Sequence, residues 1–149
     1  MIRCHLSKKK LDTSDYTKKQ IDKAENAVLS YFEWEKGHKL KPIMVEKPLV
    51  SEECKFGGTV DFYGLVDGVK MLIDFKTSKG IFDEMLIQVA AYRKLLEEHD
   101  HKVEQVKILR VGRDATEGFE ERTLVDTGTH WRIFKYCIGI YRLRKLLNK

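Results

Sequence analysis

The dipeptide Asp67-Gly68 constrains the fold of this chain most, because it separates two apolar runs. Asp-Gly is a favoured two-residue turn of an antiparallel hairpin, in which both residues adopt a positive φ. The pattern therefore predicts paired strands at residues 56–66 and 69–76. Asp61 lies six residues before Asp67, and Asp74 lies six residues after Gly68. The hairpin thus places Asp61 approximately opposite Asp74, with two carboxylates side by side.

Both aspartates interrupt apolar strands, and a lysine follows the second one. Asp61 and Asp74 each stand between two apolar residues, and Lys76 lies two residues after Asp74. Residues i and i+2 of a strand face the same side, so Asp74 and Lys76 point together. Charges at the edge of a core are costly unless they pair with one another or hold a metal ion.

This charge combination suits phosphodiester cleavage. Two adjacent carboxylates repel one another, and a bound Mg²⁺ or Mn²⁺ relieves the repulsion that Lys76 only partly offsets. Such a metal polarises a phosphoryl oxygen and activates an attacking water, while a nearby lysine stabilises developing charge. The structural alternative is that Asp61, Asp74 and Lys76 form an ion-pair cluster on a sheet face.

Periodicity and turn residues predict the rest of the chain as an α/β (α+β) domain. One domain spans residues 1–149, and residues 1–13 form a flexible basic arm. The first three strands form an antiparallel meander, and the fourth joins after a helical crossover to give a mixed sheet flanked by helices. The expected further elements are helices at 14–36, 81–99 and from about 128 to the end, and strands at 42–50, 102–111 and 119–125.

The first helix supplies a candidate third carboxylate. Its expected buried stripe runs through Ile21, Val28 and Leu29, and Glu25 falls within that stripe. Glu25 could therefore complete a metal site, or it could lie at the stripe's margin and reach solvent. Glu46 on the first strand is a rival for the same role.

These residues resemble the PD-(D/E)XK nucleases. Asp61 matches the second motif of that superfamily, and Asp74-Phe75-Lys76 matches its (D/E)-x-K motif. Gln88 and Tyr92, four residues apart on the next helix, resemble the Q-x-x-x-Y motif of the RecB-like branch, with small phage and prophage nucleases the most similar. The resemblance covers about residues 20–112. It implies a restriction-endonuclease-like αβββαβ core, to which this chain adds a C-terminal helix.

The resemblance also implies roles for these residues. Asp61, Asp74 and the main-chain oxygen of Phe75 would bind Mg²⁺ or Mn²⁺, and Lys76 would assist catalysis. Gln88 and Tyr92 would support the site and engage DNA, although an i, i+4 pair can also simply pack a helix. Lys79, on the loop after Lys76, is the best placed cation for DNA.

The chain departs from the family in three respects. Val60 stands where the second motif usually has proline, and neither His5 nor His38 lies in the context of the upstream motif histidine. Glu25 could replace that histidine as a ligand. Members with an iron–sulfur cluster use four cysteines, so we expect no cluster here, and no disulfide framework. This chain has only three cysteines, and they lie far apart in the sequence: Cys4, Cys54 and Cys137.

The composition agrees with a polyanionic partner without requiring one. The net charge is +5, and no apolar run is long enough to span a membrane. The final helix carries cations that could follow a phosphate backbone or simply form a solvated face: Arg132, Lys135, Arg142, Arg144 and Lys145. We expect a cytoplasmic deoxyribonuclease of DNA processing, in a bacterial or phage-infected cell. The rivals are a restriction-type or junction-resolving endonuclease and a non-catalytic DNA-binding module on the same fold.

Overall fold

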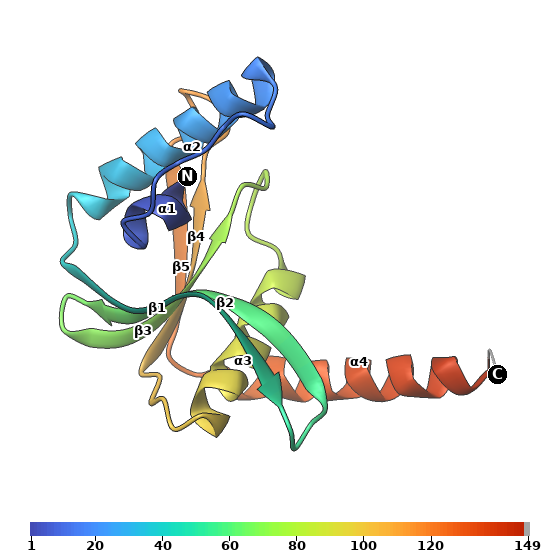
Figure 1. Cartoon of the computed structure of the whole chain (residues 1–149). Helices are drawn as coiled ribbons and strands as arrows, with labels where there is room; N and C mark the ends of the chain where they lie inside the picture. Colours follow the sequence, from blue (N-terminus) through green and yellow to red (C-terminus); the bar gives the residue numbers. More distant parts are fainter. Residues whose placement is uncertain (148–149) are drawn as a thin grey trace.

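The computed structural model describes residues 1–147, in which a five-stranded mixed sheet has helices on both faces (Figure 1). This confirms a mixed α/β class. The helices are α1 (Ile2–Leu6), α2 (Lys18–Glu35), α3 (Asp83–Glu98) and α4 (Gly128–Leu147). The strands are β1 (Leu40–Ser51), β2 (Phe56–Val66), β3 (Val69–Lys76), β4 (Gln105–Val111) and β5 (Phe119–Leu124).

The strands lie in the sheet in the order in which they follow along the chain. The pairs β1–β2, β2–β3 and β4–β5 are antiparallel, whereas β3 and β4 are parallel and are joined through α3. The expected meander and helical crossover are therefore confirmed. β1 is an edge strand, which agrees with Pro48, because proline has no N–H to donate to a second neighbour.

The Asp67-Gly68 turn has the geometry that its residues favour. Asp67 has φ 52° and Gly68 has φ 87°, as a type I′ hairpin requires. The ladder runs from Val66 opposite Val69 to Phe62 opposite Ile73. This register confirms the count from the turn as far as Phe62 and Ile73, where the paired residues end.

Each face of the sheet packs against a different helix. The α3 face buries leucines of the helix against valine, leucine and isoleucine of β2, β3 and β4; its members include Leu86, Leu95, Val60, Leu72 and Ile108. The α2 face is more aromatic and includes Tyr31, Trp34, Phe62, Ile73 and Leu109. The charged residues of β2 and β3 thus lie between two filled layers.

The predicted buried face of the first helix is wrong at Leu29, although Ile21 and Val28 are partly buried as expected. Leu29 is 64% exposed, and the buried positions are instead Ala27, Ser30, Tyr31 and Trp34. The two aromatic side chains bury more apolar surface than Leu29 does, so they turn the helix toward the sheet. Glu25 is exposed. The helix also begins later than expected, at Lys18, because Thr17 and Gln20 form a capping box.

The first residues do not form the expected flexible arm. Residues 2–6 form α1, and Ile2 and Leu6 pack against the α2-side core. Two contacts hold this helix: an ion pair of Arg3 with Glu46 of β1, and a hydrogen bond between His5 and Glu35 of α2 at 3.0 Å. The aperiodic sequence hid this helix because its contacts are with residues far along the chain.

Helix α4 follows β5 and contacts the rest of the molecule through aromatic residues near its beginning and through Arg142 in its second half. Trp131 and Phe134 pack against Phe56 at the end of the β1–β2 hairpin. Tyr141 and Leu146, further along the helix, are 59% and 62% exposed. The outer half of the helix extends away from the sheet (Figure 1).

Candidate active site

Asp61 lies where β2 and β3 separate. The paired residues of the two strands end at Phe62 and Ile73, one step before the two aspartates. Beyond that point, Asp61 Oδ2 accepts a hydrogen bond from the main-chain N–H of Phe75 at 3.0 Å. The carboxylate therefore binds the backbone of the strand that carries Asp74. Burial raises the pKa of Asp61, although the bond from Phe75 and the charge of Lys76 oppose the shift.

Asp74 is the most deeply buried carboxylate of the site. The residue is only 2% exposed, and its Oδ2 lies 2.7 Å from Lys76 Nζ. Among the residues that the structure describes, this oxygen receives no well-directed hydrogen bond. The pKa of Asp74 is raised to about 6. Burial is the main cause; Lys76 opposes the shift, and the nearby charge of Asp61 adds to it. Lys76 therefore compensates the buried charge only in part.

Helix α3 holds Lys76 from the other side. Lys76 Nζ donates to Gln88 Oε1 at 2.8 Å, and Gln88 Nε2 donates to the Tyr92 hydroxyl at 2.8 Å. Gln88 and Tyr92 lie one turn apart, so both side chains reach the same side of the helix. The predicted pair thus does more than pack α3, because it fixes the position of the lysine.

Gly58 permits the close approach of Tyr92 to β2. A Cβ atom at position 58 would lie 2.4 Å from Tyr92 Cε1, which is closer than any real contact. Only glycine therefore lets the tyrosine ring lie against this strand. Sequence reasoning did not single out this role, although two consecutive glycines shortly before Asp61 were the available signal.

A pocket of about 310 Å³ lies beside Asp61 on the α2 side of the sheet. Arg3, Glu46, Asp61 and Phe75 contribute to its wall. Glu46 has φ 49°, an unusual backbone conformation for this residue type, and its side chain pairs with Arg3. Arg3 is a residue of this region that no local sequence pattern indicated.

The structure brings Glu46, but not Glu25, to the pocket of Asp61. Glu25 lines a different pocket, together with Leu29 and Phe32. The expectation that Glu25 faces the sheet is therefore wrong, and its alternative, a position at the margin that reaches solvent, is confirmed. Within residues 1–147, His5 forms its hydrogen bond with Glu35, and His38 forms its own with Asp67 at 2.6 Å.

The donor atoms of the site suit a hard divalent cation. Within residues 1–147, no three or more His, Cys, Asp or Glu side chains lie together in a group that could hold a metal ion. Two carboxylates are nevertheless compatible with Mg²⁺, which usually keeps several waters and takes only one or two carboxylates from the protein. The observation that favours a cation here is the pair of carboxylates whose pKa values are both raised, although Lys76 lies 2.7 Å from Asp74 Oδ2.

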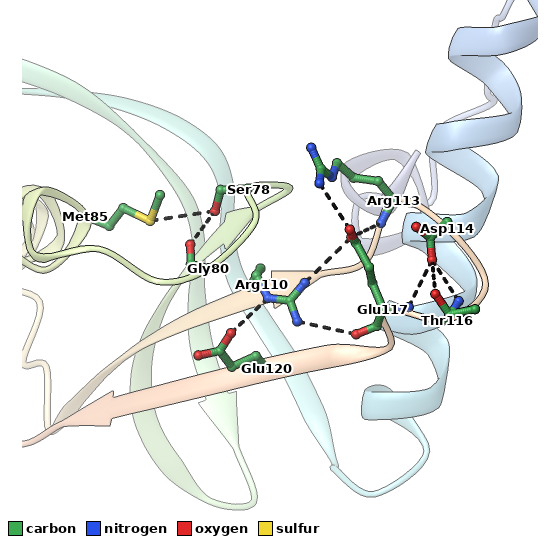
Figure 2. A network of polar contacts seen from close by, with 9 residues as sticks. All are labelled: Ser78, Gly80, Met85, Arg110, Arg113, Asp114, Thr116, Glu117 and Glu120. Atoms are coloured by element: carbon green, nitrogen blue, oxygen red, sulfur yellow. Dashed lines mark hydrogen bonds and ion pairs between the residues drawn. The ribbon is translucent and has the colours of Figure 1, made fainter.

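A second charged cluster lies on β4 and β5, next to the site. Arg110 is the register neighbour of Lys76 on the parallel strand β4. Its guanidinium donates to Glu120 at 3.0 Å and to the carbonyl of Glu117 at 3.4 Å (Figure 2). Glu117 also binds Arg113 at 3.1 Å. This cluster pairs its cations with carboxylates from the neighbouring strand and turn.

The remaining predicted cations lie on the surface. Lys79 is exposed on the loop that follows β3. On α4, Arg142 donates to the carbonyls of Cys54 and Lys55, so it helps to attach the helix to the β1–β2 hairpin. The other cations of this helix are exposed: Arg132, Lys135, Arg144 and Lys145.

Comparison with known proteins leaves the family open. No protein-family model matches this sequence, and no curated protein matches it either. None of the helices within residues 1–147 is long and apolar enough to cross a membrane. The function must therefore be argued from the geometry of Asp61, Asp74, Lys76, Gln88 and Tyr92.

Proposed function

We propose that this chain is a metal-dependent deoxyribonuclease of the PD-(D/E)XK type, which hydrolyses DNA phosphodiester bonds. One observation carries the proposal: the buried carboxylate of Asp74 lies 2.7 Å from Lys76 and close enough to Asp61 to feel its charge, and its pKa stays raised despite the lysine. Such under-compensated charges are characteristic of functional sites rather than of packing.

The arrangement of elements supports the same proposal. Helix α2, strands β1 to β3, helix α3 and strand β4 follow in the order helix, three strands, helix, strand. This is the order of the αβββαβ core of the nucleases that the sequence resembles. The two aspartates lie on the paired strands β2 and β3, and the Gln–Tyr pair lies on the crossover helix. These positions support the proposal, because the resemblance expects its motif residues on the same elements.

The roles of the residues follow from their contacts. Asp61, Asp74 and the main-chain oxygen of Phe75 would hold Mg²⁺ or Mn²⁺, which supplies an activated water and polarises the phosphoryl group. Lys76 stabilises the negative charge that develops on the phosphate, and Gln88 holds the lysine for this task. Tyr92 fixes Gln88 through its hydroxyl. A preorganised lysine stabilises charge without first having to reorient.

DNA contacts would come from exposed groups near these residues. Lys79 lies three residues after Lys76 on an exposed loop, and Gln88 and Tyr92 are partly exposed. The net charge of +5 favours association with a polyanion. These contacts would be to phosphates, so we expect little sequence specificity.

A cleavage assay tests the proposal. Linear duplex, single-stranded and supercoiled DNA are incubated with Mn²⁺, Mg²⁺ or EDTA, using wild type, Asp74→Ala, Lys76→Ala and Lys70→Ala. The cleavage rates of Asp74→Ala and Lys76→Ala should each fall at least about a hundredfold below that of wild type. Lys70→Ala is the matched control, because Lys70 is exposed on the same strand β3.

The result also separates the rival activities. DNA binding without cleavage under any metal would overturn the nuclease proposal and favour a binding module. Nicking of supercoiled circles would identify an endonuclease, whereas degradation of linear ends alone would identify an exonuclease. Cutting at one defined sequence would favour the restriction-type enzyme, and preference for branched DNA would favour a junction-resolving one.

A further inference from the structure

Helix α4 carries apolar residues on two opposite faces. Trp131, Phe134 and Ile138 lie on one face and are partly covered, the first two by Phe56. At 100° per residue, a second group lies on the opposite face of the helix. A surface helix of a globular domain needs only the first of these faces. The second face therefore requires a different explanation.

The second face is a continuous exposed seam. Its residues follow spacings of three and four along the helix: Ile133, Tyr136, Ile140, Leu143 and Leu147. Ile133 is 39% exposed, and the exposed fractions of the other four lie between 59% and 85%. Arg142 contacts the β1–β2 turn from the opposite face of the helix, and the end of α4 extends beyond the other elements (Figure 1), so nothing in the described part of the chain covers this seam.

We propose that α4 of a second copy of this chain covers the seam, in a parallel two-stranded coiled coil. Alternate spacings of three and four define the a and d positions of a heptad repeat. Ile133 and Ile140 occupy a positions, and Tyr136 and Leu143 occupy d positions. Isoleucine at a with leucine at d favours two parallel strands. This inference does not depend on the proposed nuclease activity.

The charges beside the seam are compatible with this partner. In a parallel pair, each g residue faces the e residue of the next heptad on the other helix. Arg132 would face Cys137 of the second copy, and Gly139 would face Arg144 of the second copy. No two cations meet across the seam. Lys135, Arg142 and Lys145 take the outward positions c and f.

The attachment of α4 to its own sheet leaves the seam available. Trp131 and Ile138 take f positions and Phe134 takes a b position, which lie on the outside of a coiled coil. The contacts with Phe56 can therefore persist when two helices pair. A lipid surface fits less well, because an interfacial helix presents one broad apolar face and gathers its charges on the other.

Sedimentation velocity over a wide concentration range tests the pairing. Wild type should form dimers as concentration rises, and Leu143→Glu should weaken dimerisation by at least about tenfold. Lys145→Glu introduces glutamate at an outward position instead, so it should leave dimerisation unchanged. Leu143 is 65% exposed, so its replacement should leave the fold of the monomer intact. A monomer at every concentration would overturn the proposal, as would a dimer that Leu143→Glu does not weaken.

Disulfide trapping tests the parallel orientation. The natural cysteines are all free, so serine can replace Cys4, Cys54 and Cys137 before Leu143→Cys is introduced. Parallel helices in register bring position 143 next to its own copy, so oxidation should produce a covalent dimer. Lys145→Cys in the same background is the control and should cross-link poorly. Failure of Leu143→Cys to cross-link would overturn the parallel arrangement, and seam-dependent binding of the monomer to phosphatidylserine vesicles would assign the seam to lipid instead.

Discussion

The sheet carries two clusters of buried charge, and they are built differently. On β4 and β5, Lys107 and Arg110 are 6% and 8% exposed. Each cation has a carboxylate opposite: Lys107 lies 2.6 Å from Glu121, and Arg110 lies 3.0 Å from Glu120. On β2 and β3, by contrast, Asp74 pairs with Lys76, and Asp61 has only the charges of Lys76 and of the exposed Arg3 nearby.

The pKa shifts of the carboxylates express this difference. Burial alone would raise the pKa of Glu121, but hydrogen bonds from Lys107 and Trp34 outweigh it and lower the pKa. Burial raises the pKa of both Asp61 and Asp74, and their partners do not reverse the shift. The β4–β5 cluster is thus balanced and stabilises the sheet, whereas the β2–β3 pair lacks positive charge. A bound divalent cation would supply that charge.

The largest expected change in the free energy of unfolding comes from Asp74→Asn, measured in EDTA so that no divalent metal is bound. The folded-state pKa of Asp74, about 6, lies above its ordinary value of 3.8, so its ionisation weakens the fold as pH rises through this range. Asparagine removes that cost. Urea unfolding at pH 8 should therefore show a gain on the order of 2 kcal/mol, reduced because the Lys76 contact is also lost. The gain should disappear near pH 4.

Glu121→Gln is the matched control and should have the opposite sign. The pKa of Glu121 is lowered in the fold, so its charge stabilises the protein above its unfolded pKa and ceases to do so as pH falls. At pH 8 the variant should lose about 1 kcal/mol, a modest value because the glutamate side chain is 38% exposed. If Asp74→Asn destabilised the protein as Glu121→Gln does, the Asp61–Asp74 pair would be a structural ion-pair cluster.

A change in stability smaller than that of Asp74→Asn is expected from alanine at two crowded glycines, one in each region. Gly58→Ala would place a methyl group 2.4 Å from Tyr92 Cε1, and Gly112→Ala would place one 2.7 Å from Glu117 Cβ. Both variants should lose about 1–2 kcal/mol through overpacking. Gly58→Ala should also reduce cleavage by tenfold or more at a temperature where it stays folded, because Tyr92 and Gln88 shift. Equal cleavage by the two variants would contradict the role of Tyr92.

The hairpin and its register could be predicted from the sequence because they depend on neighbouring residues. Asp67 and Gly68 accept positive φ, and the ladder then follows residue by residue to Phe62 and Ile73. The contact between Lys76 and Asp74 follows from their spacing on one strand. The i, i+4 spacing likewise placed Gln88 and Tyr92 on one side of α3. In each case the interaction is local or is fixed by one turn.

The remaining parts of the site depend on contacts between distant segments. The buried face of α2 was mispredicted because Tyr31 and Trp34 competed with Leu29, and the outcome depends on the surface of the sheet. Glu46 reaches the pocket of Asp61 through a backbone with φ 49° on a strand whose register shifts, which its local sequence does not reveal. The docking of α1 through Arg3 is equally invisible in short segments.

The smallest expected effect concerns Arg3, an exposed cation of α1 that lies at the pocket of Asp61. Arg3 pairs with Glu46 and lines the pocket of Asp61, but its side chain is 59% exposed, unlike the buried cations of β4. Removing its positive charge should strengthen cation binding, so Arg3→Ala should raise the affinity for Mn²⁺ about two- to fivefold, as expected for an exposed pair. Titration calorimetry with Mn²⁺ measures this, with Arg3→Lys expected to behave as wild type. Lys10→Ala, which removes an exposed cation of the same segment, controls for net charge. Unchanged or weaker Mn²⁺ binding by Arg3→Ala would show that Arg3 does not compete with the metal, and the imbalance at Asp61 and Asp74 would then be independent of α1.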